Sequence, residues 1–327
     1  MAKIDGKLKP PGALGRIEAL AAQVARLQGT LSPRMSTARL VIFAADHGLA
    51  DAGVSAYPAA VTRQMVQSFV AGGAAANVFA RQGGLDLQVV NAGVRGGEFG
   101  SDAVHELGLG NGTASSLAGP AMTAGQRDAA LRHGETIGAE GDWDALALGE
   151  MGIGNTSAAA LIAHRLTGAD LSGLVGRGTG LDDAGLVHKH DILSRASARV
   201  AAKLSPAEVL SEFGGFEIVM MTGAMIGAAR AKRIVLVDGF IASAAALTAA
   251  QLDPSCRSAM VFCHRSEEPG HAVILDAMGA RPLLSLNMRL GEGTGAALAW
   301  PLVRSAVAML NDMASFESAG VSGPTSE

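Results

Sequence analysis

Short runs of mostly apolar residues recur along the chain, and each stops abruptly at polar residues and glycines. Continuous apolar runs, in contrast to alternating ones, are typical of strands that are buried on both faces of a parallel sheet. We therefore predict strands at residues 40–43, 87–90, 145–148, 234–237, 260–262 and 283–286.

Between these runs, apolar residues recur at every third or fourth position, which predicts helices. The stretches with this period are residues 59–81, 120–139, 156–166 and 216–231. Alternating strands and helices indicate an α/β fold, with a doubly wound, mostly parallel sheet that helices cover on both faces. In the last of these helices Gly223 and Gly227 lie on one face, so a second backbone can approach that face closely.

The two ends of the chain differ from the middle, because each predicts a helix with no strand beyond it. Residues 12–28 place apolar side chains on one helical face, and residues 296–313 predict the last helix. We expect a large α/β domain over residues 30–294 and a small helical domain formed by residues 1–29 and 295–315. Residues 316–327 are rich in Ser, Gly and Pro, which predicts a disordered tail.

Composition and charge narrow the class of protein. The net charge is −4 and no Lys/Arg run appears, so we expect no nucleic-acid partner. No apolar stretch reaches the roughly 20 residues of a membrane span, and the N-terminus has no secretory signal. Cys256 and Cys263 are too few for a disulfide framework, which favours the cytoplasm. Glycine, at 43 of 327 residues, is nearly twice as frequent as usual and is concentrated in loops, where backbone approaches a ligand.

Ligands of doubly wound sheets bind beyond the carboxyl ends of the strands, so the polar residues that follow the apolar runs are candidate site residues. These are Asp46, His47, Asn91, Glu150, Asn155, Asp238, His264, Arg265, Glu267 and Glu292. The histidines lack the spacing of metal ligands, and we expect no metal site. Asp46 and His47 are adjacent, so their side chains point in different directions, which favours a structural use of the pair.

The densest glycine-rich segment, residues 149–157 (GEMGIGNTS), leads from a predicted strand into an alanine-rich helix. Asn155, Thr156 or Ser157 is available as the N-cap, and the free amides of the first turn could bind a phosphate. A tight turn without any ligand is equally compatible with this segment.

A second segment, residues 176–183 (GRGTGLDD), is followed by Lys189 and could complete an anion site. Taken alone, the sequence fits better with a loop in which Asp182 or Asp183 caps the next helix.

The third segment, residues 291–295 (GEGTG), places Glu292 between glycines, as Glu150 is placed in the first segment. Two such carboxylates suit acid–base chemistry or the stabilisation of positive charge. Taken singly, each is more commonly an acid that interacts with a helix dipole.

A set of motifs in this order resembles the nicotinate-nucleotide–dimethylbenzimidazole phosphoribosyltransferase family over nearly the whole chain. No single motif is specific, but the ordered set is. The motifs are residues 9–16 (KPPGALGR), 45–48 (ADHG), 53–58 (GVSAYP), 61–65 (VTRQM), 149–157, 178–183 (GTGLDD) and 290–295 (LGEGTG).

The resemblance implies a glycosyltransferase that moves 5-phosphoribose from nicotinate mononucleotide to 5,6-dimethylbenzimidazole. The products would be nicotinate and α-ribazole 5′-phosphate, which is used to assemble the lower loop of cobalamin. It also implies a cytoplasmic homodimer with a Rossmann-like sheet and no cofactor, because nicotinate leaves as a neutral ring and no pyrophosphate has to be neutralised by magnesium.

Site residues follow from the same resemblance. Glu292 would be the general base, and Glu150 would orient the ribose or stabilise positive charge. The phosphate would be held by Gly152, Ile153, Gly154, Asn155, Thr156, Gly178, Thr179, Gly180 and Lys189. The acceptor base would be bound by Tyr57, Pro58, Gln64, Met65 and Leu290.

Three alternatives stay open at this point. The acceptor could be another base or a phenol. A nicotinamide-dependent oxidoreductase would need a GxGxxG turn after its first strand, whereas the first run here ends in Asp46-His47-Gly48. A catalytically inactive nucleotide-binding subunit would have no need of both glycine-flanked glutamates.

Overall fold

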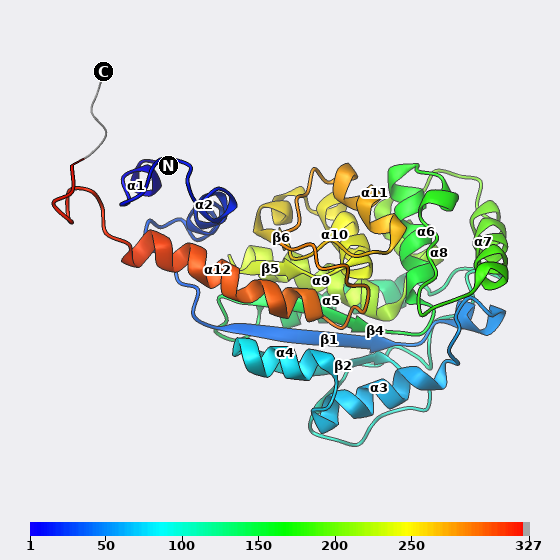
Figure 1. Ribbon diagram of the computed structural model, residues 1–327. Helices are drawn as coiled ribbons and strands as arrows, with labels where there is room; N and C mark the ends of the chain where they lie inside the picture. The colour runs from blue at the N-terminus through cyan, green and yellow to red at the C-terminus, as the bar shows by residue number, and fades with distance from the viewer. Residues whose placement is uncertain (323–327) are drawn as a thin grey trace.

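The computed structural model describes residues 1–322, which fold around one six-stranded sheet (Figure 1). The strand order is β3-β2-β1-β4-β5-β6, and every neighbouring pair is parallel. The strands are β1 (Ala38–Ala45), β2 (Asp86–Gly93), β3 (Val104–Glu106), β4 (Ala145–Met151), β5 (Ile234–Val237) and β6 (Met260–Phe262).

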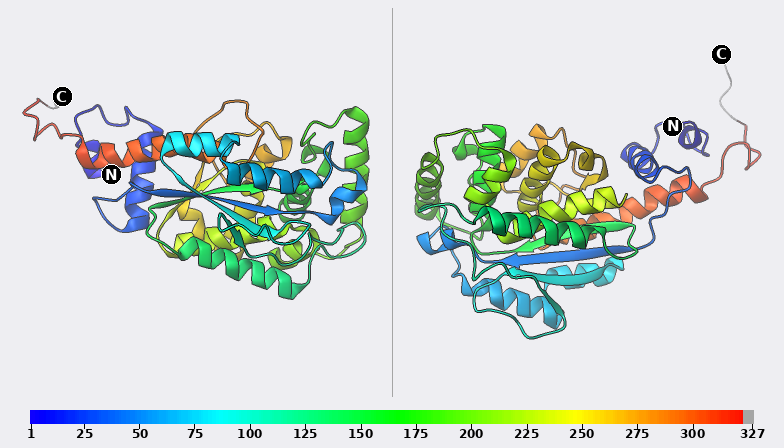
Figure 2. Two further views of the ribbon diagram at one scale, coloured as in Figure 1. Left: turned by 90° about the horizontal axis from the view of Figure 1, so that it is seen from below. Right: turned by 180° about the vertical axis from the view of Figure 1, so that it is seen from behind.

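Helices cover both faces of the sheet, which confirms the predicted doubly wound α/β fold (Figures 1 and 2). One face is covered by α2 (Arg16–Gln28), α3 (Ala60–Ala71), α4 (Ala75–Gly83) and α12 (Thr294–Asp312). The other is covered by α5 (Ala124–Ala139), α6 (Asn155–Thr167), α8 (Pro206–Phe213), α9 (Phe216–Arg230), α10 (Phe240–Leu252) and α11 (Pro269–Ala277). The short α1 (Ala2–Asp5) precedes α2, and α7 (Asp183–Ala198) packs beside α6. No helix within residues 1–322 is long and apolar enough to cross a membrane.

Five of the six predicted strands form, and one does not. Residues 283–286 stay in a loop, where only Leu284 makes an isolated bridge to His264. The chain then turns outward, and Leu286 is 53% exposed, so this apolar run lacks the burial that a central strand provides. The single helix predicted at residues 59–81 is two helices, because Gly72 adopts a left-handed conformation after α3 and ends it.

The N-terminal helices α1 and α2 and the end of α12 lie at the same end of the molecule (Figure 1). Helix α2 packs against α12, and Lys7 forms an antiparallel bridge with Ser315. The sequence predicts a disordered tail from residue 316, but its first residues are ordered. The Phe316 amide donates to the Gly6 carbonyl, and a turn follows. The rest of that expectation, residues 323–327, lies outside the described residues. The division into large and small domains stays a prediction.

Helices α5 and α9 are in direct backbone contact on one face of the sheet. A Cβ atom on Gly134 would lie 2.0 Å from the Met220 carbonyl oxygen, and one on Gly223 would lie 2.1 Å from that of Leu131. The prediction that Gly223 and Gly227 permit a close backbone approach is therefore confirmed. The contact comprises Gly134 and Gly138 of α5 and Gly223 and Gly227 of α9.

Candidate active site

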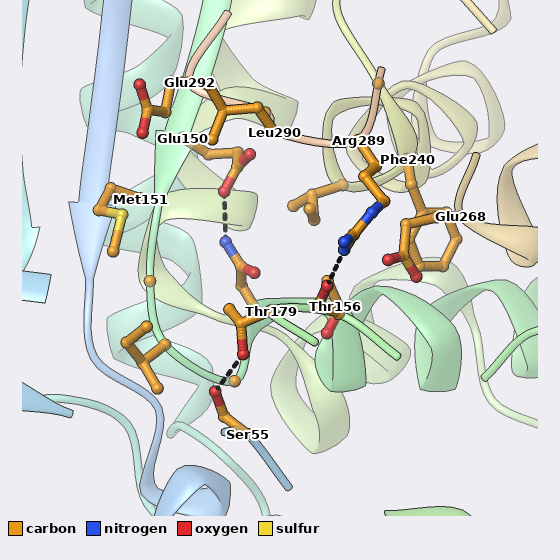
Figure 3. A pocket seen from close by; sticks show the side chains of 18 of the residues that line it. Ser55, Glu150, Met151, Thr156, Thr179, Phe240, Glu268, Arg289, Leu290 and Glu292 are labelled. Carbon is orange, nitrogen blue, oxygen red and sulfur yellow. Dashed lines mark hydrogen bonds between the residues drawn. The ribbon is translucent and has the colours of Figure 1, made fainter. Parts of the chain in front are cut away.

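A cavity of about 490 Å³ opens beyond the carboxyl ends of β1, β4, β5 and β6 (Figure 3). The chain leaves β1 toward β2 on one side and leaves β4 toward β5 on the other, so the strand order reverses between β1 and β4. Crevices at such reversals are the usual ligand sites of this fold class. The lining residues are Val54, Ser55, Tyr57, Glu150–Thr156, Gly178, Thr179, Gly239–Ile241, His264, Ser266, Glu268 and Arg289–Glu292.

Glu292 lies in the turn that enters α12, and its backbone is left-handed (φ 61°), as are those of Gly291 and Gly293. The backbone amide of Ala76, in the first turn of α4, favours the ionised form of the Glu292 carboxylate. The side chain is 6% exposed, and this burial raises the pKa of Glu292 to about 7. A carboxylate with that pKa can both accept and release a proton near neutral pH, as a general base must.

Glu150 ends β4 and is buried on the same side of the cavity (Figure 3). Its Oε2 accepts a hydrogen bond from the Asn155 side chain. Burial, followed by the charges of Asp238 and Glu217, raises the pKa of Glu150 well above its usual value. A Cβ at position 291 would lie 2.2 Å from Glu150 Oε1, so Gly291 is what allows this carboxyl group to be there.

Asp238 follows β5 and anchors the start of α12. It accepts the amides of Gly293, at 3.1 Å, and Ala296, at 3.0 Å, and so fixes the turn that carries Glu292. The His264 ring, after β6, lies 3.6 Å from the Asp238 carboxylate. Burial raises the pKa of Asp238, and the nearby His264 opposes that change.

The glycine-rich turn after β4 has a different N-cap from the one predicted. Gly154, with φ 98°, is the N-cap of α6, because the Asn155 side chain is turned toward Glu150. The Ile153 amide donates to Thr62 Oγ1, at 3.1 Å, so it is not available to a ligand. Within residues 1–322 the amides of Gly154 and Thr156 have no hydrogen-bond partner, and they remain candidates for holding an anion.

Lys189 of α7 joins this turn to the second glycine-rich segment. Its ammonium group donates to Thr156 Oγ1, at 2.9 Å, and to the Gly176 carbonyl, at 3.1 Å. Burial lowers the pKa of Lys189 to about 8. Gly178 and Thr179 line the cavity, whereas Gly180 and Lys189 do not, so Lys189 supports the wall from behind.

The other predicted residues divide between the cavity and the surface. Tyr57 and Leu290 line the cavity, but Pro58, Gln64 and Met65 do not, and Gln64 is exposed on α3. Asp182 caps α7 by accepting the Gly185 amide, at 2.8 Å, in agreement with the structural alternative.

His47 and Asp46 do not interact as a catalytic pair. His47 Nε2 lies 2.7 Å from Glu217 Oε1 of α9, and both side chains are buried. Asp46 instead accepts the Arg95 amide, at 2.8 Å. The two side chains therefore point to different partners, as expected for adjacent residues, and their structural use stays a prediction.

Sequence reasoning missed Glu268 and Arg289. It selected the neighbours Arg265 and Glu267, which are exposed and outside the cavity, whereas Glu268 lines it. The available signal was Pro269, which marks the first turn of α11 and so places Glu268 at the helix start. Arg289 donates to the Gly178 carbonyl, at 2.9 Å, from a loop with no regular pattern.

Comparison with known proteins identifies the class to which this fold and site belong. The model of a family described as phosphoribosyltransferase matches residues 1–321, so this chain is a phosphoribosyltransferase by class. Relatives from Cupriavidus necator and Aromatoleum aromaticum, named nicotinate-nucleotide–dimethylbenzimidazole phosphoribosyltransferase, are 53% and 51% identical to it over 324 and 323 residues. Each alignment covers 98% of this chain and 94% of the relative.

The solved structures agree with the sequence comparisons. The crystal structure of CobT from Thermus thermophilus is 42% identical, with a TM-score of 0.95 over 99% of this chain and 98% of that one. This chain therefore belongs to the nicotinate-nucleotide–dimethylbenzimidazole phosphoribosyltransferase family.

Proposed function

We propose that this chain transfers 5-phosphoribose from nicotinate mononucleotide to 5,6-dimethylbenzimidazole, giving nicotinate and α-ribazole 5′-phosphate for the lower loop of cobalamin. The names of relatives about half identical over nearly the whole chain support this reaction. The observation that carries it is the placement of two buried glutamates, Glu150 and Glu292, on one cavity. Burial raises the pKa of both carboxyl groups, which is typical of acids that take part in catalysis.

The donor phosphate binds between the start of α6 and the loop at Gly178. The amides of Gly154 and Thr156 face this part of the proposed site at a helix N-terminus, where an anion is favoured. Lys189 supplies positive charge through its contact with Thr156 Oγ1. This arrangement holds one end of the substrate and fixes the position of the ribose.

Glu150 then stabilises the positive charge that develops on the ribose. In the donor, the nicotinate nitrogen carries a positive charge, and charge moves to the ribose C1′ as the C1′–N bond breaks. A positive charge nearby lowers the pKa of a carboxyl group, so a bound donor favours the ionised form of Glu150. The electron pair of the broken bond stays on nicotinate, which leaves as a neutral ring.

Glu292 is the base. One ring nitrogen of dimethylbenzimidazole forms the new bond to C1′, and the other nitrogen loses its proton to the Glu292 carboxylate. The pKa of about 7 keeps a large part of Glu292 ionised and able to accept that proton. Tyr57, Met151 and Leu290 supply an apolar lining for the acceptor ring.

We further propose that the enzyme works as a cytoplasmic homodimer, as its family resemblance implies.

The reaction is tested by incubating purified protein with both substrates and quantifying nicotinate and α-ribazole 5′-phosphate by chromatography. Equal amounts of the two products are expected, and each substrate alone serves as the control. Nicotinate release without the ribotide would indicate hydrolysis, and no release would contradict the proposed function.

A further inference from the structure

Glu268 is a buried acid that the mechanism above does not use. It occupies the N-cap position of α11, yet its side chain does not cap that helix and lines the cavity instead. The residue is 7% exposed, and its Oε2 is buried without a hydrogen-bond partner among residues 1–322. A Cβ at Gly176 would lie 2.0 Å from this oxygen, so the glycine makes room for the carboxylate.

The surroundings of Glu268 are those of the proposed phosphate site. The Gly178 amide and the positive charges of Lys189 and Arg289 all favour the ionised form of this carboxylate and oppose the effect of burial on its pKa. Arg289 also donates to the Gly178 carbonyl, and in Figure 3 it lies with Glu268 and Thr156 at the opposite end of the cavity from Glu292. On α11 itself, burial lowers the pKa of His271 to about 3, so that ring is neutral.

A carboxylate at this place balances the charge of Lys189 while the site is empty, and it opposes a phosphate that arrives. Burial already raises the pKa of Glu268, and a phosphate dianion beside it raises that pKa further, because like charges disfavour ionisation. Protonation removes the repulsion and turns the unpartnered oxygen into a hydrogen-bond donor.

We propose that Glu268 takes up one proton from solvent when the substrate 5′-phosphate binds, and that its Oε2 then donates a hydrogen bond to a phosphate oxygen. This inference rests on the proposed function, since it needs the phosphate to bind between Thr156 and Gly178. Substrate affinity is thereby linked to pH: where one full proton is taken up, Kd rises about tenfold for each pH unit.

The measurement is isothermal titration calorimetry of nicotinate mononucleotide in two buffers with different ionisation enthalpies, which counts the protons taken up. At about pH 7.5 the ligand phosphate is almost fully dianionic, because its second pKa is near 6. That pH also lies below the pKa of about 8 of Lys189, which limits its contribution. Any proton that Glu150 releases when the donor binds is common to all these variants, so the readout is a difference in net uptake. The wild-type protein and Glu267→Gln, a neighbouring exposed control, are expected to take up the same number of protons, about one more than Glu268→Gln.

Glu268→Gln is expected to take up about one proton fewer than wild type when nicotinate mononucleotide binds, and its Kd is expected to rise about tenfold less for each pH unit over this range. Nicotinate riboside carries the same positive charge but lacks the phosphate, so it is expected to bind wild type with about one proton fewer taken up than nicotinate mononucleotide. This arm does not depend on the variant folding. Undiminished uptake in Glu268→Gln, or equal uptake with the riboside, would overturn the inference. Absence of any binding of nicotinate mononucleotide to wild type would instead overturn the proposed function.

Discussion

Replacement of Glu292 by glutamine separates two effects of one buried carboxylate. The variant keeps the shape of the side chain and one of its oxygens beside the Ala76 amide, but it cannot take a proton from the acceptor. A general base contributes about 10²–10⁴ in rate, or roughly 3–5 kcal/mol of barrier. We therefore expect kcat to fall by that factor while nicotinate mononucleotide still binds.

The same change is expected to stabilise the fold at high pH. The pKa of Glu292 is raised from 4.5 to about 7, so in the wild-type protein the favourable contribution of the neutral form is lost as the pH rises through 7. At about 1.4 kcal/mol for each pH unit between the two values, that loss reaches about 3 kcal/mol. Glutamine does not titrate, so Glu292→Gln gains up to that amount over wild type near pH 8, and the difference shrinks toward pH 5.

Two assays test this reasoning: steady-state nicotinate release between about pH 6 and 9, and urea unfolding at about pH 5 and 8 with equal protein concentrations. Glu267→Gln is the control, because Glu267 is exposed and outside the cavity. Turnover close to wild type would remove Glu292 from the role of base. If the free energies of unfolding of Glu292→Gln and wild type differed by the same amount at both pH values, burial of Glu292 would not be the source of its raised pKa, and the reasoning would be refuted.

Three further predictions follow from other parts of the site. Lys189→Met should raise the KM for nicotinate mononucleotide at neutral pH. It should also remove the additional increase in KM that loss of the Lys189 charge causes above its pKa of about 8, which a pH series of initial rates will show. Gly291→Ala and Gly97→Ala both force a left-handed alanine, at a cost of about 1–2 kcal/mol. Only Gly291→Ala should lose activity, because only its Cβ meets Glu150, and thermal melts with parallel rate assays separate the two effects. In a panel of acceptors, 5,6-dimethylbenzimidazole should have a higher kcat/KM than adenine and p-cresol. Its two methyl groups, at about 0.8 kcal/mol each, should raise kcat/KM roughly tenfold over that of benzimidazole. A higher kcat/KM for adenine or p-cresol would contradict the apolar lining.

The parts of the fold that the sequence predicts are those with a local signal. Strands β1 and β4 are buried along nearly their whole length and β2 over its second half, so most of their side chains are apolar. Glu150 and Glu292 stand out because each is placed among glycines at the end of an apolar run, and the structure brings both to one cavity. By contrast, α10 is apolar on all sides because it is buried all round, so it has no helical period to detect.

The parts that the sequence does not predict depend on distant contacts. Of the adjacent acids Glu267 and Glu268, only the second faces the cavity. The packing of α11 against the loop at Gly176 decides this, and the local sequence carries no information about that packing. The partner of His47 is Glu217, far along the chain on α9, and only the folded sheet brings the two together. Pro58 and Gln64 were assigned through a motif, and a motif does not specify which of its side chains reach a cavity.

The glycine contact between α5 and α9 has a genetic consequence. A single-base change in a glycine codon gives another glycine codon, a stop codon, or a codon for a residue that has a Cβ atom. At Gly134 and Gly223 that atom would fall on a carbonyl group of the facing helix, so a nonsynonymous point mutation has no conservative outcome there. The first turn of α9 carries Glu217, which contacts His47. Mutations at the glycine contact should therefore disturb the active site, although α9 contributes no residue to the lining of the cavity.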